Sequence, residues 1–320
     1  MSELSVEQLR SSQPVADDEI DLRELFGVLW RGKWTIVITT VLAAAIAVAV
    51  ALNMPNIYRS EALLAPISAE NGGLGGLASK YGALAGLAGI SLPSGGSDKT
   101  SLGLEIMKSR QFFEQFLSRH DVLVPLMATQ GWDPSTGDLV LNSEVYDVAS
   151  GQWLREAKPP RGSQPSVQEA HEVFLGLLST SQDKTSGFVT VAVEHQSPIV
   201  AQQWVEWLVA DINETVRAQD VAQAERSIAY LEEQIRATSL AELQAGFFEL
   251  IQSQIETMML AKATPEYLFK TIDPAVVPEL KVKPKRSLIA ALGVVLGGML
   301  GVLFVLIRHY AFSRPRSSAY

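Results

Sequence analysis

Two long apolar segments stand out from an otherwise mixed pattern of hydrophobic and polar positions. The first runs from Trp34 to Leu52 and the second from Ser287 to Ile307, and neither contains a charged residue. A helix of about 20 residues spans a hydrocarbon core of about 30 Å. Buried helices of soluble domains are usually shorter. The pattern therefore predicts transmembrane helices at 34–52 and 287–307.

The flanks of these two segments predict their orientation. Basic residues precede the first span and follow the second, so both ends of the chain are expected in the cytoplasm, as an arm (1–33) and a tail (308–320). Because the arm is long and no small-residue cleavage site follows the first span, we interpret that span as an uncleaved anchor. A basic cluster at 281–286 argues for the opposite orientation, but long loops cross the membrane largely regardless of charge.

Small residues recur every fourth position in both spans. They are Ala43, Ala47 and Ala51 in the first span and Gly293, Gly297 and Gly301 in the second. Such spacing places small side chains on one face and allows membrane helices to approach closely. Gly and Ala are also common in membrane helices generally. We expect a packing face, and the spacing leaves open whether its partner lies in the same chain or in a neighbour.

The region between the spans, 53–286, alternates strand and helix patterns, which predicts an α+β domain. Strand-like patterns occur near 57–67, 186–195 and 266–272, and the second of them is rich in β-branched residues. Apolar spacing predicts a helix over 99–119, and Ser166 with Glu169 forms a capping box that begins another helix, which ends near 178. Proline and glycine mark turns and short strands over 131–165, and nine glycines over 72–96 predict a loop.

A long helical region is predicted over 198–262. Continuous helix of this length would extend roughly 100 Å, which a domain of this size does not bury. Ser239 and Glu242 match a capping box and indicate a break. We therefore expect an extended hairpin or a bent helix whose apolar stripe is met by other subunits.

Composition excludes several classes of protein. The chain has 320 residues, 47% of them apolar, a net charge of −9 and no cysteine. It therefore has no disulfide, thiolate zinc site or cysteine nucleophile, and its acidity argues against nucleic-acid binding. Residues 53–280 carry 28 acidic and 15 basic residues, and the basic cluster follows them. One interpretation is that the cluster contacts anionic headgroups or a pyrophosphate-linked lipid. We prefer the alternative, that its lysines anchor the span at the membrane interface.

Catalytic patterns are sparse. The His171-Glu172 pair begins like a zinc-protease motif, but Leu175 stands where the second histidine would be. No phosphate-binding loop or nucleophile elbow occurs. We expect no catalytic residue, no cofactor and no metal, and hence no enzyme. A two-span sensor and a polymer-trimming hydrolase are the alternatives from other classes; the first needs an output module and the second paired carboxylates.

Several motifs resemble the Wzz-type chain-length determinant proteins, also called polysaccharide co-polymerases. They lie in order along most of the chain, the most specific being the stretch from Met258 to Glu279, which leads into the basic cluster and the second span. The resembling positions near that span are Pro274, Pro278, Lys283, Pro284, Lys285 and Arg286. The prolines are spaced more loosely than the denser pattern of the family.

The resemblance implies a regulator in the bacterial inner membrane. It implies a periplasmic α/β base with a long projecting helix, and a homo-oligomeric ring that sets the length of a polysaccharide made by a separate membrane polymerase. O-antigen of lipopolysaccharide is the preferred polymer, with capsule, exopolysaccharide or common antigen as alternatives. A lipid-linked polysaccharide is a further candidate partner. Some relatives carry a cytoplasmic tyrosine kinase, for which the 13 residues after Ile307 would leave no room.

Overall fold

A computed structural model describes residues 22–67 and 95–312 of the chain. The fold divides into two compact units, one formed by the chain ends (1–54 and 285–320) and one by residues 55–284. We refer to them as the helical unit and the base unit. The arm before residue 22, most of the predicted glycine-rich loop and the end of the tail lie outside the described residues.

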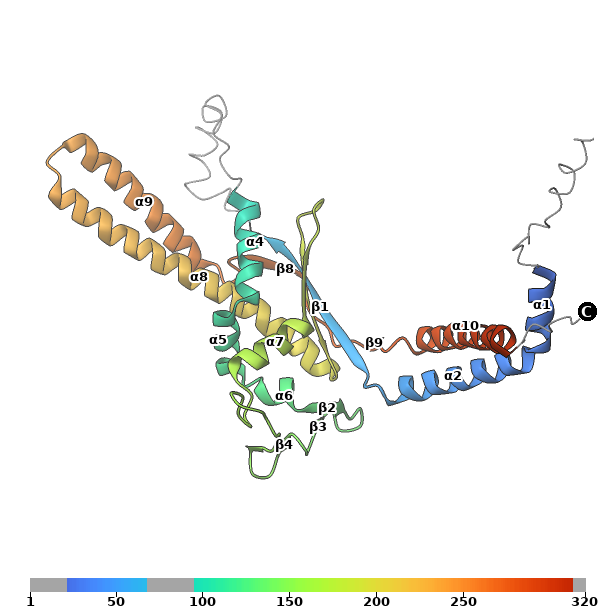
Figure 1. Cartoon of the computed structure of the whole chain (residues 1–320). Helices are drawn as coiled ribbons and strands as arrows, with labels where there is room; N and C mark the ends of the chain where they lie inside the picture. Colours follow the sequence, from blue (N-terminus) through green and yellow to red (C-terminus); the bar gives the residue numbers. More distant parts are fainter. Residues whose placement is uncertain (1–21, 68–94, 313–320) are drawn as a thin grey trace, which may run out of the picture. The chain divides into compact units, whose positions relative to one another are not determined.

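The helical unit contains α1 (Leu22–Arg31), α2 (Lys33–Asn53) and α10 (Arg286–Phe312), shown at the right of Figure 1. α2 and α10 pack side by side. Both are long and apolar enough to cross a membrane. The helix α10 continues five residues past Ile307, the end of the predicted second span, through an apolar and aromatic stretch.

The base unit is built on an antiparallel sheet in the order β6-β7-β1-β8, with β9 also paired to β1. The strands are β1 (Ile57–Pro66), β6 (Leu178–Gln182), β7 (Val189–His195), β8 (Phe269–Asp273) and β9 (Lys281–Lys283). Ala62 lies opposite Val191 and Leu64 opposite Val189. The three predicted strands are thus confirmed, together with the α+β class of the domain.

One face of this sheet carries the core. Alternate residues of β1 and β7 are buried, as the two-residue period of a strand requires. Strand β8 contributes Phe269 to this hydrophobic core, and helices α5, α7 and α8 contribute the rings of Phe113, Phe116, Phe174 and Trp204. These rings contact one another from three helices, so the cluster fixes the helices to one another.

The helix predicted over 99–119 is two helices, α4 (Gly95–Lys108) and α5 (Arg110–His120). The prediction of a single helix was wrong because Ser109 breaks it. Ser109 has extended backbone angles, and its hydroxyl accepts a hydrogen bond from the Phe112 N–H, which makes it the N-cap of α5. In contrast, the capping box predicted at Ser166 and Glu169 is confirmed at the start of α7 (Val167–Leu177).

The long helical region is a hairpin of α8 (Pro198–Ala237) and α9 (Ala241–Ala263), which extends from the sheet in Figure 1. α8 has 40 residues, about 60 Å of helix. The predicted break is confirmed, but the predicted capping box is wrong: Leu240 is the N-cap and its side chain makes no cap. Instead, the amide of Gln244 donates to the carbonyls of Ile235 and Thr238 and closes the turn.

Three hairpin loops of the base unit share the pattern Asp-x-x-Ser/Thr-Gly, which the sequence analysis missed. The first lies between β2 (Thr129–Trp132) and β3 (Leu139–Leu141), the second between β4 (Tyr146–Asp147) and β5 (Gln152–Trp153), and the third between β6 and β7. They begin at Asp133, Asp147 and Asp183, and end at Gly137, Gly151 and Gly187. Each glycine has a positive φ, and each aspartate accepts a hydrogen bond from the backbone N–H two residues later.

Candidate functional site

The glycines of α10 lie against α2 of the same chain. A Cβ atom on Gly293 would stand 2.5 Å from Ala47 Cβ, and one on Gly297 would stand 2.6 Å from Ala43 Cβ. A Cβ atom on Gly301 would meet the Ile36 backbone at 2.9 Å. Real Cβ contacts are longer than this, so only glycine permits the observed approach of the two helices. We call these contacts the glycine seam.

Two threonines and a basic residue complete the seam. The hydroxyls of Thr39 and Thr40 donate back to carbonyls one turn earlier in α2, so both are satisfied within an apolar helix. Ala51, the last of the predicted alanines, is buried, and the Arg286 Nε–H donates to its carbonyl at 3.2 Å. That bond binds the start of α10 to the last turn of α2.

The juxtamembrane residues predicted from the family motif lie in an extended connector between β8 and α10, interrupted by β9. Pro274, Pro278 and Pro284 lie in its irregular segments, beyond regular strands. Lys283 Nζ forms an ion pair with Glu194 of β7 at 2.5 Å, and Lys281 Nζ donates to Asn56 Oδ1. Lys285 is exposed. Part of the basic cluster is thus engaged within the fold.

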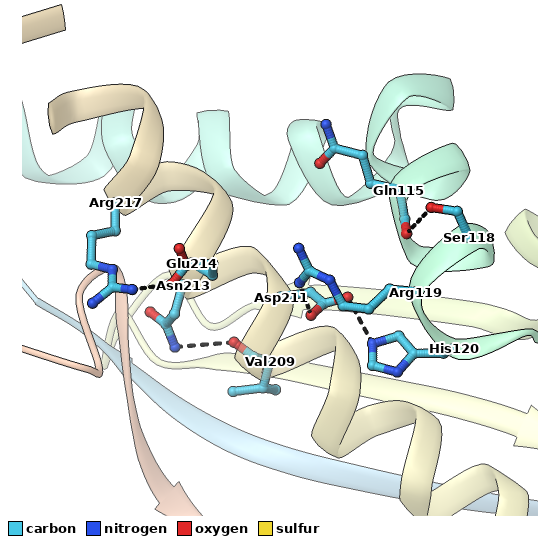
Figure 2. A network of polar contacts seen from close by, with 9 residues as sticks. All are labelled: Gln115, Ser118, Arg119, His120, Val209, Asp211, Asn213, Glu214 and Arg217. Atoms are coloured by element: carbon cyan, nitrogen blue, oxygen red, sulfur yellow. Dashed lines mark hydrogen bonds and ion pairs between the residues drawn. The ribbon is translucent and has the colours of Figure 1, made fainter. Parts of the chain in front are cut away.

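A polar network joins α5 to α8 at the edge of the core, and Figure 2 shows its members. Asp211 is buried on α8 and accepts from Arg119 Nη1 at 2.5 Å. Its second oxygen lies 3.0 Å from His120 Nε2, and the His120 ring stacks on Trp207 at 4.2 Å. Arg119 and His120 offset the cost of burying the carboxylate, and the network therefore holds the end of α5 against α8.

Asn213, two residues further along α8, binds the start of β8. Its Oδ1 accepts from the backbone N–H groups of Leu268 and Phe269, and its Nδ2 donates to the carbonyls of Val209 and Phe269. The side chain is buried and uses its full hydrogen-bonding capacity. It is therefore a structural clip between the hairpin and the sheet.

Two further histidines bind backbone carbonyls in the base unit. His171 Nε2 lies 2.8 Å from the Lys108 carbonyl at the end of α4. His195 accepts from the Ser197 N–H at Nδ1, so its Nε2 carries the proton and donates to the Pro125 carbonyl. Burial lowers the pKa of His195 below its ordinary value. The contacts are structural, and no group of three His, Cys, Asp or Glu suited to a metal occurs among the described residues.

A third polar contact holds α4 to the hairpin. Asp220 on α8 accepts from Lys99 Nζ at 3.1 Å and from the Tyr267 hydroxyl at 2.7 Å. Burial, together with this carboxylate, raises the pKa of Tyr267 above its ordinary value. Tyr267 therefore stays a neutral donor, and the contact fixes the segment between α9 and β8 against α8.

The hairpin itself exposes a long apolar surface. On α9 and its N-cap, large apolar side chains remain exposed over five turns, at Leu240, Leu243, Phe248, Leu250, Ile255, Met259 and Leu260. At 100° of rotation per residue these side chains lie on several sides of the helix. A helix of a soluble monomer usually buries apolar side chains of this size. A surface of this size is typical of a protein–protein contact.

These features define a class of protein: an α+β domain with a helical hairpin, inserted between two closely packed helices able to cross a membrane. Residues 18–120 match the family described as Wzz, chain length determinant protein. Residues 248–310 match GNVR, described as a G-rich domain on putative tyrosine kinase. The chain thus carries a Wzz chain-length determinant domain and a GNVR domain, which confirms the resemblance seen in the sequence.

Comparison with solved structures found a protein described as a full-length bacterial polysaccharide co-polymerase. It is 16% identical in sequence, and the alignment covers 93% of this chain and 100% of that chain, with a TM-score of 0.38. Comparison with curated proteins found no match.

Proposed function

We propose that this protein is a non-catalytic regulator of polysaccharide chain length in the bacterial inner membrane. α2 and α10 cross the bilayer, both termini lie in the cytoplasm and the base unit lies in the periplasm. The observation that carries the proposal is the pair of family matches, because the Wzz match contains the first predicted span and the GNVR match contains the second. The polar contacts described in the base unit, such as those of Asp211 and Asn213, hold its helices and strands together, which fits a non-catalytic role.

The regulator acts as a homo-oligomeric ring on a separate membrane polymerase, with a lipid-linked polysaccharide as a further partner. The exposed apolar surface of the hairpin along α9 supports self-association, since a second copy would remove part of it from water. Projection images of detergent-solubilised particles test this. Rings are expected, and uniformly monomeric particles would reject the oligomer.

O-antigen of lipopolysaccharide is the preferred polymer. Deleting the gene and separating surface lipopolysaccharide on a gel tests this directly. Loss of the preferred chain length is expected, and its return on complementation assigns the effect to this protein. An unchanged length distribution would reject O-antigen; measuring capsule, exopolysaccharide and common antigen in the same strain then tests the alternative polymers.

A further inference from the structure

Three aromatic side chains form a row across the junction of α1 and α2. Phe26, Trp30 and Trp34 recur every four residues, and they are 65%, 63% and 70% exposed. The rings of Phe26 and Trp30 stack with centroids 6.0 Å apart. A short helix that leaves two such rings in water has an unpartnered apolar face.

A packed glycine fixes the bend between the two helices. Gly32 is the one residue between α1 and α2, and a Cβ atom there would stand 2.5 Å from Val305 Cγ1 of α10. Hydrogen bonds continue through the bend, from the Gly32 N–H to the Val28 carbonyl and from the Ile36 N–H to the Gly32 carbonyl. In Figure 1 the dark-blue α1 turns sharply away from the axis of α2. α1 therefore does not prolong the apolar helix that follows it.

Cationic side chains flank the aromatic row. Arg31 and Lys33 stand on either side of the bend and are exposed. Lys33 Nζ lies 5.0 Å from the centre of the Trp30 ring, a cation–π contact. Aromatic rings next to Lys and Arg at the end of a span are typical of the membrane–water interface, and such cations are attracted to anionic headgroups.

We propose that α1 lies in the plane of the membrane surface where α2 begins. Phe26 and Trp30 insert at the boundary between headgroups and acyl chains, while Arg31 and Lys33 contact the phosphate groups of anionic phospholipids. This inference rests on the two spans of the proposed function and goes beyond it, because it assigns α1 a lipid ligand. The direct continuity of α1 with α2 favours lipid over a protein partner as the occupant of the aromatic face.

The absence of cysteine in the chain makes a clean experiment possible. An environment-sensitive fluorophore is attached to Phe26→Cys in the full-length protein in nanodiscs, without any polymerase. Val28→Cys is the matched control, since its side chain projects about 160° away from those of Phe26 and Trp30 round the helix. We expect a blue shift and quenching by headgroup-proximal spin-labelled lipid at position 26, and weaker quenching at position 28.

A second variant tests the charge. With Arg31 and Lys33 present, we expect stronger quenching at position 26 in nanodiscs that contain anionic phosphatidylglycerol than in nanodiscs of phosphatidylcholine alone. Replacing both residues by glutamine should remove this difference. Water-like emission at position 26 in nanodiscs would overturn the proposal, as would shielding that appears only when a second protein is added. An effect of phosphatidylglycerol that survives the double replacement would overturn the assigned role of the cations.

This probe and the gene deletion fail independently. The fluorescence is measured in purified protein, so water-like emission would leave chain-length regulation untouched. Conversely, an unchanged polysaccharide in the deletion strain would reject the function while α1 remained bound to lipid.

Discussion

Asn213 of α8 forms hydrogen bonds in both directions with Phe269 of β8. Its side-chain oxygen accepts from the Phe269 N–H at 2.8 Å, and its side-chain nitrogen donates to the Phe269 carbonyl at 3.1 Å. The amide thus takes the place of a neighbouring β-strand for the first residue of β8. Because the partner lies 56 residues away along the chain, this contact ties the far side of the hairpin to the sheet.

Replacing this clip should destabilise the base unit. Asn213→Leu leaves the N–H groups of Leu268 and Phe269 buried without their partner, and each lost group costs about 1–3 kcal/mol. We expect a lower midpoint of thermal unfolding and early proteolysis near β8. Gln203→Ala, an exposed change on the same helix, is the control. Equal stability of the two variants would show that water replaces the amide.

Crowding the glycine seam should disturb function without preventing accumulation. A Cβ atom on Gly297 would already stand 2.6 Å from Ala43 Cβ and 3.0 Å from Thr40 Cα, and Gly297→Leu adds a larger side chain at this position. Overpacking of this kind costs about 1–3 kcal/mol. We expect the protein to reach the membrane in normal amount while the polysaccharide loses its preferred length on a gel.

The neighbouring glycine supplies the control for that experiment. A Cβ atom on Gly298 makes only an ordinary contact, 3.7 Å from Thr40 Oγ1. Gly298→Leu should therefore keep the normal length distribution. If Gly297→Leu keeps it as well, the seam has no role in length control.

Local signals in the sequence predicted the elements that depend on local physics. The uncharged runs marked the two helices able to cross a membrane, and Ser166 with Glu169 marked the start of α7, because apolar length and capping are properties of consecutive residues. The break at Ser109 was missed because the apolar spacing continues across it. The false capping box at Ser239 matched the pattern, but the helix begins two residues later.

The roles of single polar residues were not predictable, since their partners are distant in sequence. No motif in the sequence marked Asn213 as structural, yet the structure buries it against the start of β8. Three of the four scattered histidines pack against core aromatic rings, an arrangement that exists only once α5, α7 and β7 are assembled. The repeated Asp-x-x-Ser/Thr-Gly loops, in contrast, were present in the sequence as a motif.

Those three loops predict a specific loss of stability in acid. Hydrogen bonds from serine side chains and backbone N–H groups hold the pKa values of Asp133, Asp147 and Asp183 below the ordinary 3.8. When the pKa of a carboxyl group is lower in the folded chain than in the unfolded chain, its ionised form stabilises the fold. This contribution is complete above the pKa of the unfolded chain and is lost as the pH falls through the pKa of the folded chain. Stability should therefore decline below about pH 4.

Replacing the three aspartates by asparagine isolates this effect. Asparagine keeps an acceptor oxygen in each turn but does not titrate, so the triple variant should lose less stability than the wild type between neutral pH and pH values below about 4. Unfolding midpoints measured across this range supply the comparison. Asp138→Asn, an exposed change beside the first loop, should behave as the wild type does. Parallel pH profiles for wild type and triple variant would contradict the prediction.

His195 predicts a second pH dependence, in a higher range. Its Nδ1 accepts from the Ser197 N–H, so a proton there would break the bond that precedes α8, and burial lowers its pKa from the ordinary 6.5. At pH values between the pKa of His195 in the folded chain and its pKa in the unfolded chain, the unfolded chain binds more protons. The stabilising contribution of neutral His195 is therefore complete above about pH 6.5 and falls as the pH decreases below that value. His195→Gln retains an acceptor and a donor without titrating. The difference in unfolding midpoint between wild type and this variant should change between about pH 7.5 and pH 5, and a constant difference would contradict a lowered pKa of His195 in the folded protein.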